Sequence, residues 1–358
     1  QVETAVADYV AAYHTYFKRN NERAEPKKKE LDPLPRVILV PGVGMFGLGA
    51  SAKDAAIAAD IAENTVEVVT DAEAISSFKP ISEADMFDVE YWSLEQAKLG
   101  KGAEKVLARQ VCVVTGGGSG IGAATARAMA AEGAEIAILD RDHDQAVKAA
   151  KAIHKQALAI QCDVTDPASV RAAFDKVVEA FGGVDIVVSN AGAAWQGNIG
   201  SVDDEVLRKS FELNFFAHQS VAQNAVRVMK AQGTYGCLLF NTSKQAVNPG
   251  KDFGPYGLPK AATLFLVRQY ALDHGKDGIR ANAVNADRVR TGLLTDDMVA
   301  TRAKARGVTE QSYMSGNLLG REVYANEVAE AFVYLAHAEK TTAGVITVDG
   351  GNIEAALR

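Results

Sequence analysis

The sequence predicts an α/β protein, with a doubly wound parallel sheet in its larger, C-terminal part and a partial α/β segment before it. From Val111 onward, short apolar runs alternate with amphipathic helical patterns, which is typical of a parallel sheet with helices on both faces. A glycine-rich stretch joins the first of these runs to the first helix, as in doubly wound folds. The 358 residues exceed the usual length of one domain, so we expect two folding units.

The first hundred residues show helical and strand patterns without a regular alternation. The expected elements are a helix over 4–19, a loop over 20–35, a short buried strand over 36–42 and a helix over 51–64. Ser51 is a plausible N-cap of the last helix. The mixed-charge stretch 80–107 is interpreted as the connection to the second unit. The chain begins with Gln1 instead of Met, which predicts a fragment of a longer protein.

The second part reads as seven strands joined by helices. The expected strands cover 111–115, 135–140, 157–164, 184–192, 235–243, 279–286 and 344–351. The first three helices are expected over 120–133, 143–155 and 166–183. Right-handed crossovers between such strands give a doubly wound fold.

Composition and charge narrow the possible partners. The formal net charge of -7 disfavours a nucleic-acid partner, and no apolar run of about 18 residues is present to span a membrane. Without a signal-peptide pattern, the cytoplasm is the expected location. Cys112, Cys162 and Cys237 are widely spaced in apolar surroundings and are expected to be buried free thiols. The six histidines are scattered, so no metal site is expected.

The glycine-rich loop runs from Gly116 to Gly122. Glycine lets the backbone turn tightly and lets a pyrophosphate approach it closely. The free N–H groups at the N-terminus of the following helix suit a phosphate. Gly118, Gly120 and Ala123 meet the dinucleotide pattern G-x-G-x-x-G/A. The alternative is a tight turn without a ligand, which the strand before and the helix after make less favourable.

An acidic residue ends the next expected strand. Asp140 stands 20 positions past Gly120, where a carboxylate accepts hydrogen bonds from the adenosine ribose hydroxyls. Because a carboxylate repels a 2′-phosphate, NAD is favoured over NADP. Arg141 follows directly, and an arginine can receive that phosphate, so NADP stays open.

A tyrosine and a lysine stand four residues apart further along the chain. Helical spacing places Tyr256 and Lys260 on one face, and Pro259 between them predicts that the helix is just beginning. Ser243 ends the strand before them, at the sheet edge where doubly wound folds bind ligands.

These motifs together resemble the short-chain dehydrogenase/reductase family over about residues 108–358. They are Thr115-Gly116-x-x-x-Gly120-Ile121-Gly122, Asp163, Asn190-Ala191-Gly192, Asn214, Ser243, Tyr256-x-x-x-Lys260 and the closing ITVDGGN. The resemblance implies an NAD-dependent oxidoreductase that acts on a small hydroxyl or carbonyl substrate. It also implies a homo-oligomer, a dimer or a tetramer.

The resemblance assigns roles residue by residue. Asn214, Ser243, Tyr256 and Lys260 would form the catalytic tetrad, and Asp163 with Val164 would hold the adenine. The cofactor-binding residues would be Gly116, Gly118, Ser119, Gly120, Ile121, Gly122, Asp140, Arg141, Asp163, Val164, Asn190, Ala191, Gly192, Tyr256 and Lys260.

Elementary chemistry supports the tetrad. A tyrosine has an ordinary pKa of about 10, and the Lys260 ammonium together with the positive nicotinamide is expected to lower the pKa of Tyr256 toward neutrality. Ser243 can hydrogen-bond the reacting oxygen, which gains charge in the transition state. Asn214 is expected to bind a water that links Lys260 to solvent.

The sequence departs from the family where a Pro-Gly turn usually follows the sixth strand. Ala286-Asp287 stand there, followed by Arg288 and Arg290. One hypothesis is that Arg288 or Arg290 binds an anionic part of the substrate, and the alternative is that both are salt-bridged or exposed. Residues 293–320 resemble the family's mobile substrate lid, in which Tyr313 and Met314 either cover the substrate or pack the lid.

The stretch 34–64 resembles the closing strand and helix of a class II sugar-phosphate aldolase, with Pro41-Gly42 where a His-Gly pair often stands. The whole chain is similar to the carboxyl portion of the bifunctional rhamnulose-1-phosphate aldolase/lactaldehyde dehydrogenase type. The expected domains are an aldolase remnant over 1–95, a linker over 96–107 and the dehydrogenase over 108–358.

The resemblance makes lactaldehyde, in rhamnose breakdown, a candidate substrate. Two alternatives remain: a non-catalytic NAD-binding module that stabilises a fused aldolase, and a fragment that keeps aldolase activity, which the absence of the family's metal ligands disfavours.

Overall fold

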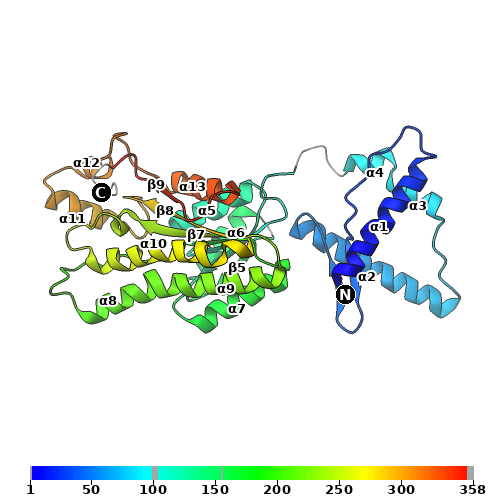
Figure 1. Cartoon of the computed structure of the whole chain (residues 1–358), viewed down its shortest axis with the longest axis horizontal. Coiled ribbons are helices and arrows are strands. Elements are labelled where there is room, and N and C mark those ends of the chain that lie inside the picture. The colour runs from blue at the N-terminus through cyan, green and yellow to red at the C-terminus, as the bar shows by residue number, and fades with distance from the viewer. Residues whose placement is uncertain (1, 99–103, 155, 353–358) are drawn as a thin grey trace. The chain divides into compact units, whose positions relative to one another are not determined.

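The computed structural model describes residues 2–98, 104–154 and 156–352. It divides into two compact units, Gln1–Glu104 and Lys105–Arg358, each described here by itself (Figure 1). Linker residues 99–103 and the expected helix end at Lys155 lie outside the described ranges.

The first unit contains four helices and one hairpin within its described residues. In order they are α1(Val2–Asn21), β1(Val37–Val40), β2(Gly44–Gly47), α2(Ala52–Ile75), α3(Glu83–Glu90) and α4(Ser93–Lys98). Ser51 caps α2 as predicted, because its side chain accepts a hydrogen bond from the backbone N–H of Asp54. The helix continues eleven residues past the expected end at 64, to Ile75.

Two expectations for this unit are wrong. The strand expected to be buried forms instead an exposed antiparallel hairpin with β2, and the side chain of Leu39 is 63% exposed. The stretch interpreted as a connection contains α3, which packs on α1. The ring of Tyr91, directly after α3, lies 5.3 Å from that of Phe17 and 4.6 Å from that of Phe87 between centroids. Aromatic packing therefore makes residues 83–91 part of the first unit.

The second unit is built on a seven-stranded parallel sheet of order β5-β4-β3-β6-β7-β8-β9. The strands are β3(Val111–Thr115), β4(Glu135–Asp140), β5(Leu158–Gln161), β6(Ile186–Ser189), β7(Gly236–Ser243), β8(Ile279–Ala286) and β9(Val345–Val348). Every neighbouring pair is parallel. The predicted fold class is confirmed.

Helices cover both faces of this sheet, and two more, α11(Asp296–Ala305) and α12(Glu310–Met314), lie in the segment before the last helix. The other helices of the unit are α5(Gly120–Ala131), α6(His143–Ile153), α7(Pro167–Phe181), α8(Asp204–Phe211), α9(Ala217–Gln232), α10(Gly254–His274) and α13(Ala325–His337). In Figure 1, α7, α9 and α10 lie on one side of the sheet, and α5 and α13 on the other.

The strand β3 shows how the sequence produces these two layers. Its five residues are all buried and alternate between the faces, as side chains of a strand must. Val111 and Val113 join the cluster with α7, α9 and α10, whereas Cys112 and Val114 join the cluster with α5, α6 and α13. The chain leaves β3 to one side for β4 and later returns to the other side for β6, so the carboxyl ends of β3 and β6 border the crevice where such sheets bind ligands.

Residues 293–320, which resemble the family's substrate lid, contain the helices α11 and α12. These helices close on their own apolar cluster of Leu294, Val299, Ala303, Tyr313 and Met314. The three cysteines are buried and free, as expected.

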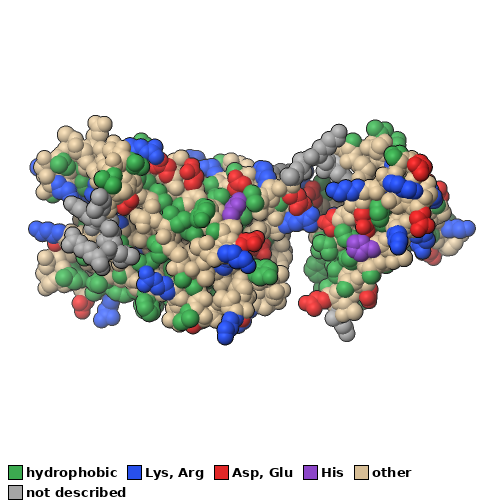
Figure 2. All heavy atoms as spheres, turned by 45° about the horizontal axis from the view of Figure 1, so that its top comes forward, with side chains coloured by type: hydrophobic (Ala, Val, Ile, Leu, Met, Phe, Trp, Pro, Cys, Tyr) green, Lys and Arg blue, Asp and Glu red, His purple; other side chains and the backbone are tan. Residues whose placement is uncertain are grey.

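Charged side chains of both signs are interspersed over the face of each unit that Figure 2 shows. No helix in the described parts of the chain has the length and apolar character needed to cross a membrane.

Candidate active site

The glycine loop after β3 has a backbone that only glycine fits comfortably. Gly116 and Gly120 have φ values of +61° and +54°, and a Cβ on Gly122 would lie 2.2 Å from the carbonyl oxygen of Gly116. The helix α5 begins at Gly120, and its N-cap Ser119 makes no side-chain capping bond. The first N–H groups of a 12-residue helix are therefore left for an anionic ligand.

A cleft of about 850 Å³ opens at this edge of the sheet. Among the predicted cofactor residues, those that line it are Gly116, Ser119, Gly120, Ile121, Asp140, Arg141, Asp163, Val164, Asn190, Ala191 and Gly192. Gly118 and Gly122 do not line the cleft but belong to the loop beside it. The cleft has the size and the phosphate-type cradle that a dinucleotide needs.

Two acidic residues hold turns at the ends of β4 and β5. The carboxylate of Asp140 accepts hydrogen bonds from the N–H of Gly118 at 2.9 Å and of Asp142 at 3.0 Å. The carboxylate of Asp163 accepts from the N–H and the hydroxyl of Thr165, and these bonds lower the pKa of Asp163. Both carboxylates are thus held at the rim of the cleft.

A second cavity, of about 300 Å³, adjoins the first, because Ile121, Ala194 and Asn241 line both. Ser243 and Tyr256 line the smaller cavity. Ser243 ends β7, where its hydroxyl also accepts a hydrogen bond from the N–H of Gln245 at 3.2 Å.

Tyr256 lies in the first turn of α10 and Lys260 in the next. The helix begins at Gly254, so Pro259 stands beyond its first turn, inside the helix, instead of at its start as expected. Both side chains are buried, with Tyr256 8% and Lys260 2% exposed. The predicted pair therefore shares one buried helix face.

In the protein alone, burial dominates the pKa of Tyr256. Burial raises it to about 12 and the carboxylate of Asp287 acts in the same direction, while the hydroxyl of Ser243 and the charge of Arg302 lower it. Lys260 Nζ lies 5.9 Å from the centroid of the Tyr256 ring, and desolvation of the phenolate outweighs the lowering influences.

The ammonium of Lys260 is directed into the protein. It donates to the carbonyl oxygen of Asn241 at 2.9 Å and lies 3.3 Å from Nε2 of His218. Burial lowers the pKa of Lys260 to about 7. Burial and the charge of Lys260 lower the pKa of His218 well below its ordinary value, so this imidazole is neutral. Its Nδ1 lies 2.6 Å from the hydroxyl oxygen of Ser189.

Asn214 occupies a π-helical turn, η1(Glu212–Phe216), between α8 and α9. Its amide donates to the carbonyl oxygen of Ala193 at 2.8 Å, and its own carbonyl oxygen accepts from the hydroxyl of Thr263 at 2.7 Å. A Cβ on Gly192 would lie 2.9 Å from Asn214 Oδ1 and 3.5 Å from Lys260 Nζ, so the strand end and both side chains meet here.

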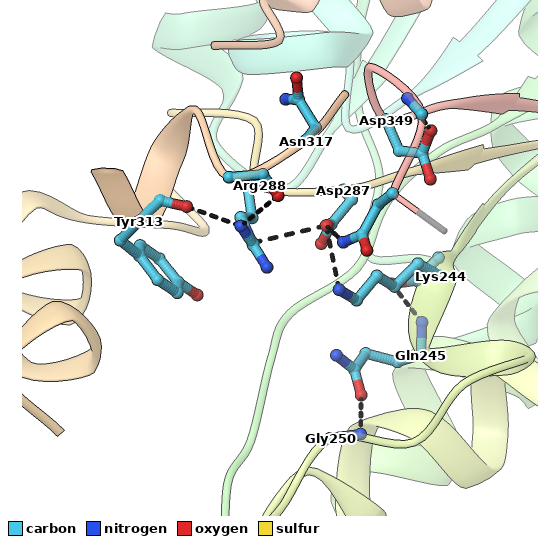
Figure 3. Close-up of polar contacts among 12 residues, drawn as sticks. Lys244, Gln245, Gly250, Asp287, Arg288, Tyr313, Asn317 and Asp349 are labelled. Carbon is cyan, nitrogen blue, oxygen red and sulfur yellow. Dashed lines mark hydrogen bonds and ion pairs between the residues drawn. The ribbon is translucent and has the colours of Figure 1, made fainter. Parts of the chain in front are cut away.

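The turn after β8 carries an ion-pair cluster (Figure 3). The carboxylate of Asp287 lies 3.2 Å from Lys244 Nζ and 3.5 Å from Arg288 Nε, and it accepts from the amide of Asn352. Arg288 also donates to the carbonyl oxygen of Tyr313 at 2.7 Å. Lys244, Asp287, Arg288 and Tyr313 line the smaller cavity.

The two arginines of the anion-binding hypothesis differ in position. Arg290 does not line the smaller cavity and pairs with Asp296 and Glu322, as in the salt-bridged alternative. Arg288 does line it, but has the partners just described.

Comparison with known proteins decides the family. Residues 116–352 match the family model described as "Enoyl-(Acyl carrier protein) reductase". The chain belongs to the short-chain dehydrogenase/reductase family. Its C-terminal unit is an oxidoreductase of this family, which uses a nicotinamide cofactor. Residues 1–99 match the model "Aldolase class II, second domain", which confirms the resemblance of the first unit.

Individual short-chain dehydrogenases and reductases resemble the chain over different lengths. "Uncharacterized oxidoreductase YuxG" of Bacillus subtilis (strain 168) is 34% identical over 98% of the chain, and the chain spans about half, 52%, of that protein. "(+)-Borneol dehydrogenase 1" of Salvia officinalis is 34% identical over 69% of the chain and 95% of its own length. The crystal structure of 3-ketoacyl-(acyl-carrier-protein) reductase from Brucella melitensis complexed with NADH is 27% identical, with a TM-score of 0.61 over 68% of the chain and 97% of that structure.

The predictions do not include His218, Lys244, Arg302 or Arg306, which the fold brings to the site. His218 stands four residues past Asn214, in a helix with many buried apolar residues, and a polar side chain there is a signal of a buried partner. The other three are ordinary surface residue types in the sequence, and only the cavity distinguishes them.

Proposed function

We propose that the C-terminal unit is an NAD-dependent dehydrogenase that moves a hydride between nicotinamide and a small hydroxyl or carbonyl substrate. The observation that carries this proposal is the junction of the two cavities. Ser243 and Tyr256 line the smaller one, and the glycine loop lines the larger one beside it.

The residues of the cleft fit a dinucleotide whose adenosine ribose carries no 2′-phosphate. The loop of Gly116 to Gly122 would hold the pyrophosphate, and Asp163 with Val164 the adenine. Asp140, held at the end of β4, would accept hydrogen bonds from the hydroxyls of the adenosine ribose. Because its carboxylate repels a 2′-phosphate, this role favours NAD over NADP. Asn190 to Gly192 would line the path toward Lys260. When bound, the nicotinamide supplies the site that accepts or gives the hydride.

The chain's own residues would manage the proton. Tyr256 donates its phenolic proton to a carbonyl oxygen in reduction and takes the hydroxyl proton in oxidation. A pKa of about 12 keeps it protonated near neutrality, which suits the donor role. Ser243 hydrogen-bonds the same oxygen and stabilises its growing charge.

The buried residues behind Tyr256 would position Lys260. With the ammonium as donor, Nε2 of His218 is the acceptor, and Nδ1–H then donates to Ser189. His218 is thus a neighbour of Lys260 in addition to the water that we expect Asn214 to bind. Asn214 is hydrogen-bonded both to Ala193, which lines the cleft, and to Thr263 of α10. It therefore links the cleft to this helix.

The candidate substrate is lactaldehyde that is formed during the breakdown of rhamnose. The aldolase-like first unit supports it, because a class II aldolase acting on a deoxysugar phosphate releases an aldehyde that a fused dehydrogenase would oxidise. Oxidation to the acid requires the aldehyde hydrate, whose hydroxyl would occupy the place of an alcohol before Tyr256.

Exposed apolar side chains support a symmetric dimer or tetramer. Phe265 and Leu272 of α10 are 66% and 76% exposed and stand seven residues apart, on one face of the helix. A monomeric mass for the protein in solution would contradict this assembly.

The test is a screen of small aldehydes and polyols with NAD and NADP, comparing the protein with Tyr256→Phe. We expect activity to fall by about 10²–10⁴-fold in the variant while NADH binding, followed by its fluorescence, stays the same. NADH binding without turnover of any substrate, or equal turnover by Tyr256→Phe, would instead favour a non-catalytic NAD-binding module.

A further inference from the structure

The small cavity beside Tyr256 has an excess of positive charge. Four cationic side chains line it, Lys244, Arg288, Arg302 and Arg306, against a single carboxylate, Asp287. A neutral aldehyde or alcohol needs none of these charges. The four cations differ in the partners that they have within the protein.

Two of the four are engaged. Lys244 and Arg288 both pair with Asp287, and Arg288 also donates to the carbonyl oxygens of Tyr313 and Gly316. Their side chains are largely buried, at 12% and 18% exposure. These two cations are committed to holding the turn after β8 against the lid.

Arg302 and Arg306 are different. Neither has an ion pair or a hydrogen bond from its guanidinium within residues 2–98, 104–154 and 156–352. The Nε–H of Arg302 is buried and without an acceptor in that part of the chain. Leaving a buried N–H of a charged guanidinium without an acceptor costs free energy. We therefore expect a ligand to supply an acceptor to Arg302.

Their arrangement suits one shared ligand. The residues are four apart, one at the end of α11 and one directly after it, so both lie on one side of the helix. The guanidinium of Arg302 lies 4.3 Å from the centroid of the Phe253 ring, and that of Arg306 lies 5.2 Å from the centroid of the Tyr313 ring. Contact with a ring orients a guanidinium but leaves its N–H edge free, and that edge matches two oxygens of a carboxylate or phosphate.

We propose that Arg302 and Arg306 bind an oxyanion, a carboxylate or phosphate group, carried by the substrate whose hydroxyl or carbonyl oxygen lies at Ser243 and Tyr256. This proposal rests on the dehydrogenase function proposed above and narrows its substrate class. Lactaldehyde would fill only the reacting end of such a site, whereas a small hydroxy acid, oxo acid or sugar phosphate would fill both ends.

Size and charge support a compact substrate. The cavity of about 300 Å³ is at the lower end of the range for ligand sites. Arg302, Arg306, Ser243 and Tyr256 all line this one cavity, so the cations and the reacting end face the same small space. A substrate of about three or four carbons would then bridge the two ends.

The test compares substrates that differ only in the anionic group. The pairs are propane-1,2-diol with lactate, for the carboxylate, and glycerol with glycerol 3-phosphate, for the phosphate. The variants are Arg302→Gln, Arg306→Gln and the double variant. Lys304→Gln is the matched control, because it removes one positive charge from the same helix at an exposed position outside the cavity.

We expect the wild-type protein to prefer one anionic member over its neutral partner by at least about tenfold in kcat/KM. The double variant should lose about 30-fold or more of that activity, mainly through KM, and a smaller factor on the neutral partner, where only the influence of Arg302 on Tyr256 is lost. Lys304→Gln should change either activity by less than about twofold. Equal use of neutral and anionic members by the wild type, or equal losses on both in the double variant, would overturn the proposal.

Direct binding separates this proposal from the function on which it rests. Inorganic phosphate and acetate are titrated into the wild-type and double-variant proteins by calorimetry. Binding of either anion that the double variant loses supports the subsite even if no substrate is turned over. Anion binding that is absent, or that is equal in both proteins, contradicts it, whatever the screen with Tyr256→Phe shows.

Discussion

Nζ of Lys260 lies 3.3 Å from Nε2 of His218, and both side chains are almost wholly buried. The carbonyl oxygen of Asn241 is the other acceptor of this ammonium. A neutral imidazole therefore supports the charge of the lysine from the side of the protein core.

Replacing His218 by Leu should lower the pKa of Lys260 further, since the ammonium loses an acceptor. The basic limb of the pH profile of kcat/KM should move to lower pH by about one unit, and the free energy of unfolding should fall by about 1–3 kcal/mol. His218→Gln offers an amide oxygen to Lys260 and an N–H to Ser189. This variant should therefore restore much of the wild-type pH profile and of the free energy of unfolding. A pH profile that is the same in wild type and His218→Leu would refute this positioning role.

The carboxylate of Asp287 raises the pKa of Tyr256, so Asp287→Asn should lower it. The activity that depends on the phenolate should then appear at lower pH, which a pH–rate profile of alcohol oxidation measures. Asp349→Asn is the control, because Asp349 is also largely buried but has no effect on the pKa of Tyr256. An equal shift in both variants would mean that a general loss of charge, and not the position of Asp287, is responsible.

Asp287→Asn should also destabilise the lid. The variant leaves the largely buried Lys244 and Arg288 without their carboxylate, and breaking such a pair costs about 3 kcal/mol. Urea unfolding of the wild-type and variant proteins measures this loss. A change below about 0.5 kcal/mol would show that the cluster contributes no more than an exposed ion pair does.

Asp140→Asn should reduce the preference for NAD over NADP by at least about tenfold. The amide keeps an acceptor for the N–H of Gly118 but removes the charge that repels a 2′-phosphate, and Arg141 stands beside it. The ratio of kcat/KM for the two cofactors is the readout. If NADP is already the better cofactor of the wild-type protein, the role proposed for Asp140 is wrong.

The stability of the protein without cofactor should depend on pH through Lys260. Its pKa is about 7 in the folded chain and about 10.4 when unfolded, so the unfolded chain binds more protons between these values. The free energy of unfolding therefore rises with pH between about 7 and 10.4, as Lys260 loses its proton in the folded chain. Below about pH 7, Lys260 is charged in both states and the full cost of burying its charge applies. Lys260→Met should raise the Tm most at about pH 6 and least at about pH 9. A pH-independent difference would mean that Lys260 titrates normally.

The parts of the site predicted from sequence are those in which local pattern and position coincide. Asp140 and Ser243 end buried strands, so the parallel sheet brings them to one edge without further information. The glycine loop and the Tyr256–Lys260 pair are each local, within seven residues.

The parts that escaped prediction depend on distant contacts. His218 and Lys260 are 42 residues apart and meet only because α9 and α10 pack on the same face of the sheet. Arg302 becomes part of a cavity only when α11 folds over Phe253. The raised pKa of Tyr256 follows from how deeply it is buried, which spacing along the chain does not encode. The exposed hairpin that contains Leu39 was predicted to be a buried strand because its sequence is apolar. An apolar run alone does not ensure burial.

The π-helical turn at Asn214 has a consequence for insertions and deletions. Such a turn contains one residue more than the α-helical turn that it replaces. Deleting one residue from Glu212–Phe216 would turn this stretch into a regular α-helical turn, and Asn214 would lose its contact with Ala193 or with Thr263. The number of residues between α8 and α9 therefore sets the position of Asn214 as strictly as its own side chain does.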